Sequence, residues 1–358
     1  MGSKQISLIP NKEGSLSLKS ISLTNSPIRL LGAAEVGARP DGLRPNRIAA
    51  RHQPLADSNL LECAACPSGV RLALQSDTTA IELDIATQPC GLASYPAELA
   101  VTVDYEVHQT VDLAAAAPQT LRFTDLPQGG KRIEIYLPQI WPVLITAVRI
   151  EDGGSLTEPE TRPRWITYGS SITHCGQADG PANTWPALVA RHNRLDLWNM
   201  GFGSNGMMDT AAARTIAETP AAAISLKLAV NAFGNYDERT FLSAAQALVL
   251  AIRDRQPDVP ILIVSPVCCP HLETAPSRTG ITLQRMRELD EELVARMQAY
   301  GHSKIGYLDG LKLFGPDDVQ LLHPEGNIHP NAQAQYLIAD RFSTQAFAPG
   351  GLFQSVSA

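Results

Sequence analysis

Charged and aromatic side chains are scarce in this sequence of 358 residues, at 18% and 6%. It has no long run of lysine or arginine, and its 29 basic and 36 acidic residues leave a formal net charge of −7. Because nucleic acids and anionic lipid surfaces are bound by clustered cations, neither is an expected partner. The sequence also lacks a stretch of about 18 apolar residues, so no segment is expected to span a membrane.

Cysteine is present only in small number. Six cysteines are too few for a disulfide framework to stabilise a chain of this length. Cys63 and Cys66 form a C-x-x-C pair, but no second pair and no histidine pair follows at the spacing of a zinc site. We therefore expect buried thiols, and neither a metal nor an organic cofactor is implied. Residues 1–15 lack the apolar core of a secretory signal, which favours a reducing, cytoplasmic location.

What the sequence does contain is a large apolar fraction, 44%, in a chain long enough for roughly two domains. In residues 81–85 (IELDI) and 132–136 (RIEIY), apolar and charged residues alternate, which places one face of a strand in a core and the other in water. Between residues 59 and 150, the spacing of the turns favours an antiparallel β-sandwich of jelly-roll type. Residues 1–58 predict irregular chain with one added strand. The predicted strands of the sandwich are 70–74, 80–85, 99–105, 120–123, 132–137 and 143–150.

The character of the sequence changes after residues 151–163 (EDGGSLTEPETRP), which are acidic, rich in glycine and proline and not periodic. They predict a linker between a β-sandwich domain, residues 1–155, and a second domain, residues 164–350. In the second domain apolar strands alternate with helices, which is typical of a doubly wound α/β fold with a parallel sheet covered on both faces. The predicted strands are 165–168, 195–200, 223–230, 261–267 and 305–308, and the predicted helices are 184–192, 207–217, 240–255, 282–300 and 330–347.

Four loops at one edge of this predicted sheet carry side chains suited to acyl transfer. Ligands of such sheets bind beyond the carboxyl ends of the strands. A serine hydrolase needs a hydroxyl nucleophile, a base within hydrogen-bond reach and donors aimed at the developing oxyanion. Ser171, His329, the Asn231 side chain and backbone amides of the loops can supply these groups. The G-x-S-x-G elbow of α/β-hydrolases is absent, since residues 169–173 (GSSIT) end in threonine.

The loops resemble the conserved blocks of the SGNH, or GDSL, hydrolases, in the expected order across residues 164–347. The Gly-Asp-Ser block is similar to residues 169–173, which implies Ser171 as the nucleophile. The Gly-x-Asn-Asp block is similar to residues 229–232 and implies Asn231 as an oxyanion donor. The resemblance further implies a flavodoxin-like three-layer fold. A β-rich N-terminal module occurs in a subset of the family that includes esterases and some acyltransferases of natural-product pathways.

The two remaining blocks supply another oxyanion donor and the base. Asn-x-Gly-x-x-Gly is similar to residues 199–204 (NMGFGS), which implies that the backbone N–H groups of Ser171 and Ser204 are donors, with Gly203 as an alternative to Ser204. Asp-x-x-His-Pro is similar to residues 326–330 (GNIHP) and implies His329 as the base.

The sequence departs from the family pattern at several positions. Ser170 and Ala232 replace aspartates outside the reacting groups, and Ser204 replaces a glycine whose backbone N–H is the functional group. The third member of the triad is open, because glycine stands where the family has its acid. Glu325 is one candidate acid. A backbone carbonyl that orients a Ser-His dyad, or a remote acid such as Asp317 or Asp318, is another.

Several other residues are candidates for a role in the site. His174 either lines the pocket or is a polar residue at a helix start, and His323 is an alternative base. No residue can be identified from its sequence spacing as a base for Cys175, so Cys175 is not a predicted nucleophile. Asp309 is expected in a turn. Gln139 and Trp141 either contact the catalytic domain or form a hydrophobic edge.

The sequence therefore predicts a serine-dependent carboxylic ester hydrolase that forms an acyl-enzyme from a small-molecule or sugar ester. An acyltransferase onto a small-molecule hydroxyl is the first alternative, because it uses the same residues. A non-catalytic carbohydrate-binding protein, in which the sandwich binds the ligand, is the second. The expected partner is a small-molecule ester or acyl donor, and the sequence does not indicate an oligomeric state.

Overall fold

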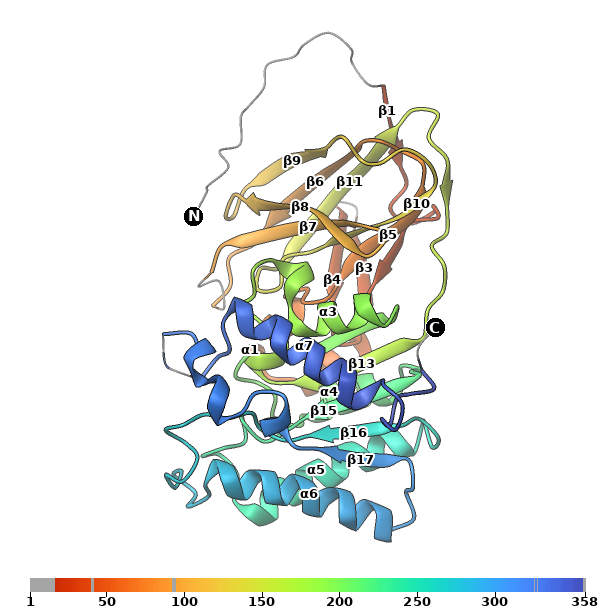
Figure 1. Cartoon of the computed structure of the whole chain (residues 1–358). Coiled ribbons are helices and arrows are strands. Elements are labelled where there is room, and N and C mark those ends of the chain that lie inside the picture. The colour runs from red at the N-terminus through yellow and green to blue at the C-terminus, as the bar shows by residue number, and fades with distance from the viewer. Residues whose placement is uncertain (1–16, 40–41, 92–94, 325, 327, 357–358) are drawn as a thin grey trace.

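The computed structural model of the chain describes residues 17–39, 42–91, 95–324, 326 and 328–356. A β-rich module made by the N-terminal part of the chain stacks on an α/β domain made by the C-terminal part (Figure 1). The predicted fold class, a β-sandwich followed by an α/β domain with a parallel sheet, is confirmed. No helix in the described ranges is long and apolar enough to cross a membrane.

The N-terminal module is a sandwich of two antiparallel sheets. The first has the order β3-β4-β11-β6-β9 with β1 on β11, and the second has the order β12-β5-β10-β7-β8 with β2 on β5. In β6, Ile81, Leu83 and Ile85 are buried and the charged residues between them are half-buried, as the alternating sequence predicts. In β10 the same prediction is wrong, because Arg132 and Glu134 are buried as well as the apolar residues. The strands of the first sheet are β1 (Leu18–Ile21), β3 (Glu35–Arg39), β4 (Gly42–Asn46), β6 (Ile81–Thr87), β9 (Pro118–Phe123) and β11 (Val143–Glu151). Those of the second are β2 (Arg29–Leu31), β5 (Arg71–Ser76), β7 (Ala97–Val103), β8 (Glu106–Leu113), β10 (Lys131–Tyr136) and β12 (Leu156–Thr157).

The secondary structure of the module differs from the sequence-based expectation in four places. Residues 18–46 form four strands rather than one. Strand β8 was not predicted, because it is an edge strand with nearly every side chain exposed and so has no apolar face. Helix α1 (Ser58–Ala65) lies where only strands were expected, and it begins at Asp57, whose side chain accepts the backbone N–H of Leu60 at 2.8 Å. Strand β12 lies within the predicted linker and pairs with β5.

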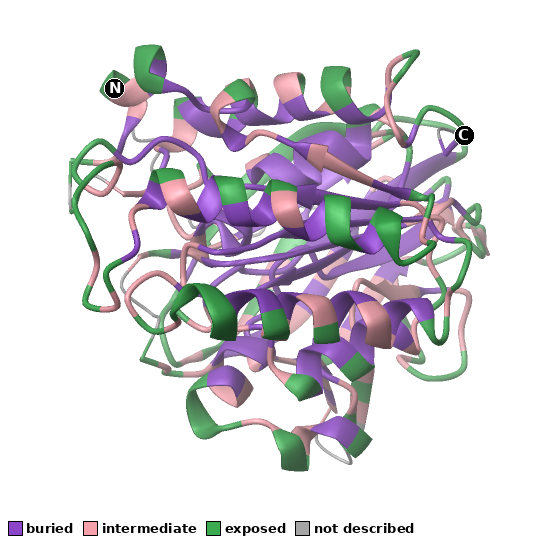
Figure 2. Cartoon of the chain, turned by 90° about the horizontal axis from the view of Figure 1, so that it is seen from below, coloured by how far each residue is buried: buried purple, intermediate pink, exposed green. Residues whose placement is uncertain are grey.

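The α/β domain contains one parallel sheet of order β14-β13-β15-β16-β17. In chain order these are strands 2-1-3-4-5 of the domain, the flavodoxin-like arrangement. Every residue of β14 and β15 is buried, because helices cover both faces of the sheet (Figure 2). The strands are β13 (Arg164–Gly169), β14 (Asp196–Gly201), β15 (Ala223–Lys227), β16 (Ile261–Val264) and β17 (Ile305–Leu308).

The helices of this domain form the outer two layers. Residues of α3 and α7 share one hydrophobic core, and residues of α4, α5 and α6 share the other. The second core also contains Ile48, Leu60 and Ala64 of the N-terminal module. The helices are α2 (Ser171–His174), α3 (Trp185–His192), α4 (Thr210–Ala217), α5 (Glu238–Arg253), α6 (Leu283–Ala299) and α7 (Ala332–Ala346), with short 3-10 helices at Ala50–Leu55, Pro181–Asn183, Gly310–Lys312 and Pro316–Leu321.

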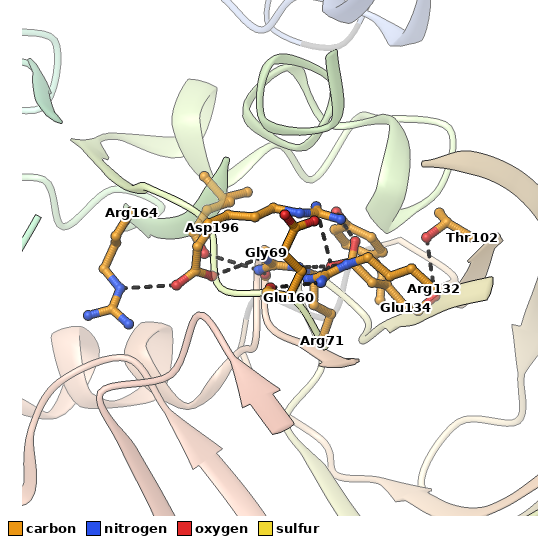
Figure 3. A network of polar contacts seen from close by, with 11 residues as sticks. Gly69, Arg71, Thr102, Arg132, Glu134, Glu160, Arg164 and Asp196 are labelled. Atoms are coloured by element: carbon orange, nitrogen blue, oxygen red, sulfur yellow. Dashed lines mark hydrogen bonds and ion pairs between the residues drawn. The ribbon is translucent and has the colours of Figure 1, made fainter. Parts of the chain in front are cut away.

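A buried polar network also joins the two modules (Figure 3). Arg71 of β5 is fully buried and donates to Asp196 at 3.0 Å and to the carbonyl of Leu197 at 3.1 Å, both at the start of β14. Its guanidinium also lies 3.3 Å from Glu134. Arg164 donates to the second oxygen of Asp196 at 3.1 Å. Because a buried charge is strongly destabilising without its partner, this network fixes how β5 meets β14.

Candidate active site

The predicted nucleophile and base lie in contact at the carboxyl edge of the parallel sheet. Ser171 is the first residue of α2, directly after β13, and its Oγ lies 2.8 Å from Nε2 of His329. His329 lies in the loop before α7. Its carbonyl accepts the backbone N–H of His323 at 2.7 Å, and Leu322 and Pro330 pair across the same loop. The 2.8 Å between Ser171 Oγ and His329 Nε2 allows the imidazole to take the hydroxyl proton.

His329 is held in the form that a general base requires. Burial, and secondarily the charge of His323, lower the pKa of His329 below its ordinary value, so the ring is neutral at neutral pH. When Nε2 accepts the Ser171 hydroxyl, the proton of the neutral ring is on Nδ1. No group among the described residues hydrogen-bonds to that Nδ1. No hydrogen bond joins His323, the alternative base, to Ser171 among the described residues.

The candidate acids for the third triad position differ in what the structure shows of them. Glu325 lies outside the described residues. Asp318 accepts the backbone N–H of Gly315 at 2.8 Å and pairs with Arg341, so its carboxylate is engaged away from His329. Neither Asp317 nor Asp318 forms a hydrogen bond with His329 among the described residues.

The side chain of Asn231, the predicted oxyanion donor, has a fixed orientation. Asn231 follows β15, and its Oδ1 accepts the backbone N–H of Gly206 at 2.9 Å. The carbonyl end of the amide is thereby fixed, and the NH₂ end has no acceptor among the described residues. Gly206 was not singled out from the sequence. A Cβ on it would lie 2.7 Å from the carbonyl oxygen of Gly169 and 3.0 Å from Oδ1 of Asn231, so only glycine fits without a shift.

Ser204 carries the loop amide that the sequence predicts as a second oxyanion donor. Its φ is +58°, in the left-handed region where the family has glycine, so the serine adopts the backbone conformation that the position requires. Its N–H has no acceptor among the described residues. The N–H of Gly203 instead donates to Nδ1 of His174 at 3.1 Å. Gly203 is therefore engaged and is not available as the alternative donor.

His174 neither lines a pocket nor acts as a simple polar residue at a helix start. It is fully buried, and burial together with the charge of Arg47 lowers its pKa to about 3. The neutral ring accepts from Gly203 through Nδ1, so Nε2 carries the proton and donates to the carbonyl of Gln139 at 2.6 Å. The predicted contact of Gln139 with the catalytic domain is thus present. Trp141 instead donates to the carbonyl of Tyr95 within its own module.

Tyr95 brings the N-terminal module close to the histidine loop. Its ring meets that of His323 edge-on, with 6.1 Å between centroids. Its hydroxyl accepts from the side chain of Gln177 at 3.1 Å. Tyr95 was not singled out from the sequence, because nothing in its local pattern indicates a contact with a residue more than 200 positions away.

The remaining candidates have structural roles. Burial raises the pKa of the Cys175 thiol, which contacts the carbonyl of Ile172 at 3.1 Å. Asp309 accepts the N–H of Leu311 in a turn. Cys63 and Cys66 are buried free thiols. In the part of the chain that the structure describes, no group of three or more His, Cys, Asp or Glu side chains is arranged to hold a metal ion.

Comparison with known proteins decides the family. Residues 163–343 match the model of the GDSL-like lipase/acylhydrolase family. The salicylyl-acyltransferase SsfX3 from a tetracycline biosynthetic pathway is 30% identical, with a TM-score of 0.84 over 90% of this chain and 95% of that one. The chain belongs to the GDSL-like lipase/acylhydrolase family. No curated protein sequence matches it.

Two more distant structures share the fold of this GDSL-like chain. A GDSL-like lipase from Bacteroides ovatus is 15% identical, with a TM-score of 0.73 over 91% of this chain and 96% of that one. A family two carbohydrate esterase from Clostridium thermocellum is also 15% identical, with a TM-score of 0.66 over 91% and 99%. Because these matches extend beyond the family model, the N-terminal module is part of the shared architecture. The GDSL-like chain is therefore an enzyme of the serine hydrolase or acyltransferase type.

Proposed function

We propose that the protein is a serine-dependent carboxylic ester hydrolase in which Ser171 forms an acyl-enzyme. The observation that carries this proposal is the 2.8 Å contact between Ser171 Oγ and His329 Nε2. Ser171 Oγ attacks the ester carbonyl while His329 takes the hydroxyl proton. The tetrahedral oxyanion accepts from the N–H groups of Ser171 and Ser204 and from the NH₂ of Asn231. Collapse breaks the ester bond, and His329 returns its proton to the departing alcohol.

In the second half of the reaction an acceptor releases the acyl group. Water, deprotonated by His329, attacks the acyl-Ser171 carbonyl, and the carboxylic acid leaves as Ser171 recovers its proton. A small-molecule hydroxyl can attack in the same way, which would make the protein an acyltransferase. This second candidate is favoured by the full-length relative at 30% identity that is named a salicylyl-acyltransferase.

A labelling experiment tests the shared first step. A fluorophosphonate probe is expected to modify Ser171 in the intact protein, with loss of fluoride, and the Ser171→Ala variant is the matched control. A wild-type protein that takes up no probe, or an alanine variant that still does, contradicts the proposal. The acceptor is decided by preforming the acyl-enzyme from p-nitrophenyl acetate and measuring how it divides between water and added alcohols. A hydrolase gives mainly acetate, and a transferase gives mainly the new ester.

The orientation of His329 has its own test. Glu325 is the proposed acid, and a Ser-His dyad is the alternative arrangement. When the triad acid of a protease is disabled, turnover falls by roughly 10⁴. A loss of this order in Glu325→Gln supports the triad, whereas a kcat within about threefold of wild type supports the dyad.

A further inference from the structure

The Gly203–Ser204 peptide group of the proposed oxyanion hole accepts a hydrogen bond from the N-terminal module. The N–H of Ser204 belongs to the same peptide unit as the carbonyl of Gly203. That carbonyl accepts from Sγ of Cys63 at 3.2 Å and from Nδ2 of Asn205 at 2.7 Å. Because a trans peptide is planar, its N–H points opposite to its C=O. The groups that hold the Gly203 oxygen therefore also set the direction in which the Ser204 N–H points.

Arg47 joins the end of β14, the strand that leads into this loop, to the N-terminal module. It is fully buried and donates to the carbonyls of Asn199 at 3.0 Å and Gly201 at 2.5 Å. Its other donors bind the carbonyls of Cys63 at 2.6 Å and Cys66 at 2.7 Å. The guanidinium also packs over the ring of Phe202, 4.8 Å from its centroid. One side chain thus joins the end of β14 to the end of α1, which carries the Cys63 thiol.

A third tie reaches the loop through His174. The carbonyl of Gln139, in the N-terminal module, accepts from this ring, and the ring accepts from the N–H of Gly203. The peptide units on both sides of Gly203 are therefore fixed. The left-handed backbone of Ser204 is unfavourable for a residue with a side chain, and such conformations persist only where the surroundings over-determine them.

We propose that Arg47 and Cys63 are positioning residues that aim the Ser204 N–H at the reacting carbonyl oxygen. The N-terminal module is then part of the acyl-transfer site rather than a separate sugar-binding unit. This inference rests on the proposed function, because it assigns a role to the module in the same oxyanion hole. Neither side chain touches the reacting atoms.

The milder test uses the two thiols of the C-x-x-C pair in the full-length protein. Cys63→Ala removes one donor to the Gly203 carbonyl. It is expected to lower kcat for p-nitrophenyl acetate by about 3- to 10-fold, the effect of one hydrogen bond, with KM within twofold. Cys66→Ala is the matched control. Its thiol is equally buried but contacts Cys90 and the carbonyl of Glu62, so kcat is expected to stay within twofold. Cys63→Ser restores a donor and is expected to recover most of the loss.

The stronger test compares the two buried arginines that join the modules at opposite ends of β14. Arg47→Met removes the tie to the oxyanion loop and is expected to lower kcat by about 10²-fold, because a displacement of about 1 Å in a reacting geometry has an effect of that size. Arg71→Met removes a similarly buried arginine that contacts Asp196 and Leu197, at the end of β14 away from the loop. Both variants are expected to melt at lower temperature, but the folded Arg71→Met protein is expected to keep its kcat within about twofold.

The outcomes separate this inference from the proposed function. A wild-type protein that neither labels at Ser171 nor hydrolyses the ester overturns the function. An active wild type whose Cys63→Ala variant keeps full kcat, or whose Cys66→Ala control loses as much, overturns only the inference. A folded Arg47→Met protein with wild-type kcat also overturns it. If Arg47→Met does not fold, the cysteine series decides alone.

Discussion

The side chain of Asn231 provides a prediction that depends on the direction of a single amide. Its Oδ1 is bound to the N–H of Gly206 at 2.9 Å, which leaves Nδ2 as the group that donates to the oxyanion in the proposed mechanism. Asn231→Ala removes this donor, and the loss of one oxyanion-hole donor reduces kcat by about 10²–10³, or roughly 2.7–4 kcal/mol of transition-state stabilisation. Asn231→Asp keeps the shape and the bond to Gly206 but places a carboxylate oxygen where the donor was.

We therefore expect the aspartate variant to be less active than the alanine variant, although it is the closer match in shape. An anionic oxygen next to a developing oxyanion repels it, whereas the space left by alanine admits water that can donate a hydrogen bond. The assay is kcat with p-nitrophenyl acetate at a pH where the aspartate is ionised, with thermal melts to confirm folding. An Asn231→Asp protein as active as Asn231→Ala, or more active, would refute the assigned orientation of the amide.

Three further predictions follow from the same geometry. Because burial and the charge of His323 lower the pKa of His329, kcat/KM should rise with pH along a limb whose midpoint lies below about 6.5, and His323→Gln should move this limb to higher pH. Gly206→Ala, whose Cβ would press on Oδ1 of Asn231, should lower kcat at least tenfold while circular dichroism stays native; an unchanged kcat would contradict the crowding. Asp318→Asn should lower the free energy of unfolding by about 1–2 kcal/mol in a urea titration and leave the pH profile of kcat unaltered, whereas a shifted profile would restore it as a triad candidate.

Most strands and helices that bury one face were predictable from the sequence, because period-two and helical patterns record burial. Helix α1 and strand β4 bury one face and were nevertheless missed, because each is short. Elements that lack a buried face, such as β8, leave no such pattern. The third and fourth strands of the parallel sheet were predicted too long for a related reason. Apolar residues continue past Lys227 into a buried loop, where Ala229 has a φ of +76° and the chain has already left the sheet. Hydrophobicity alone does not distinguish a buried strand from the buried turn that follows it.

The candidate site residues were predictable where a short block of sequence contains both the functional residue and the neighbours that identify it. The positions of Ser171, Asn231 and His329 follow from strand ends that meet at one edge of a parallel sheet. Gly206 and Tyr95 were not predictable, because their roles depend on contacts between segments distant in sequence. His174 shows the limit most clearly. It lies three residues from Ser171, yet its function is set by a backbone carbonyl 35 residues earlier and a loop amide 29 residues later.

The placement of the two buried arginines explains why the N-terminal module cannot be treated as an addition to the catalytic domain. Arg71 binds the beginning of β14 and Arg47 binds its end, so the strand that leads into the oxyanion loop is held at both ends by the other module. Among the described residues, four carbonyl groups and the ring of Phe202 face the Arg47 charge. Burial lowers its pKa to about 10, so it is still protonated at neutral pH. A buried cation of this kind tolerates little displacement of its acceptors, because each lost hydrogen bond leaves charge unsolvated. The rigidity that the left-handed Ser204 requires is thus obtained from an electrostatic constraint outside the catalytic sheet, and this is the physical basis for including the module in the site.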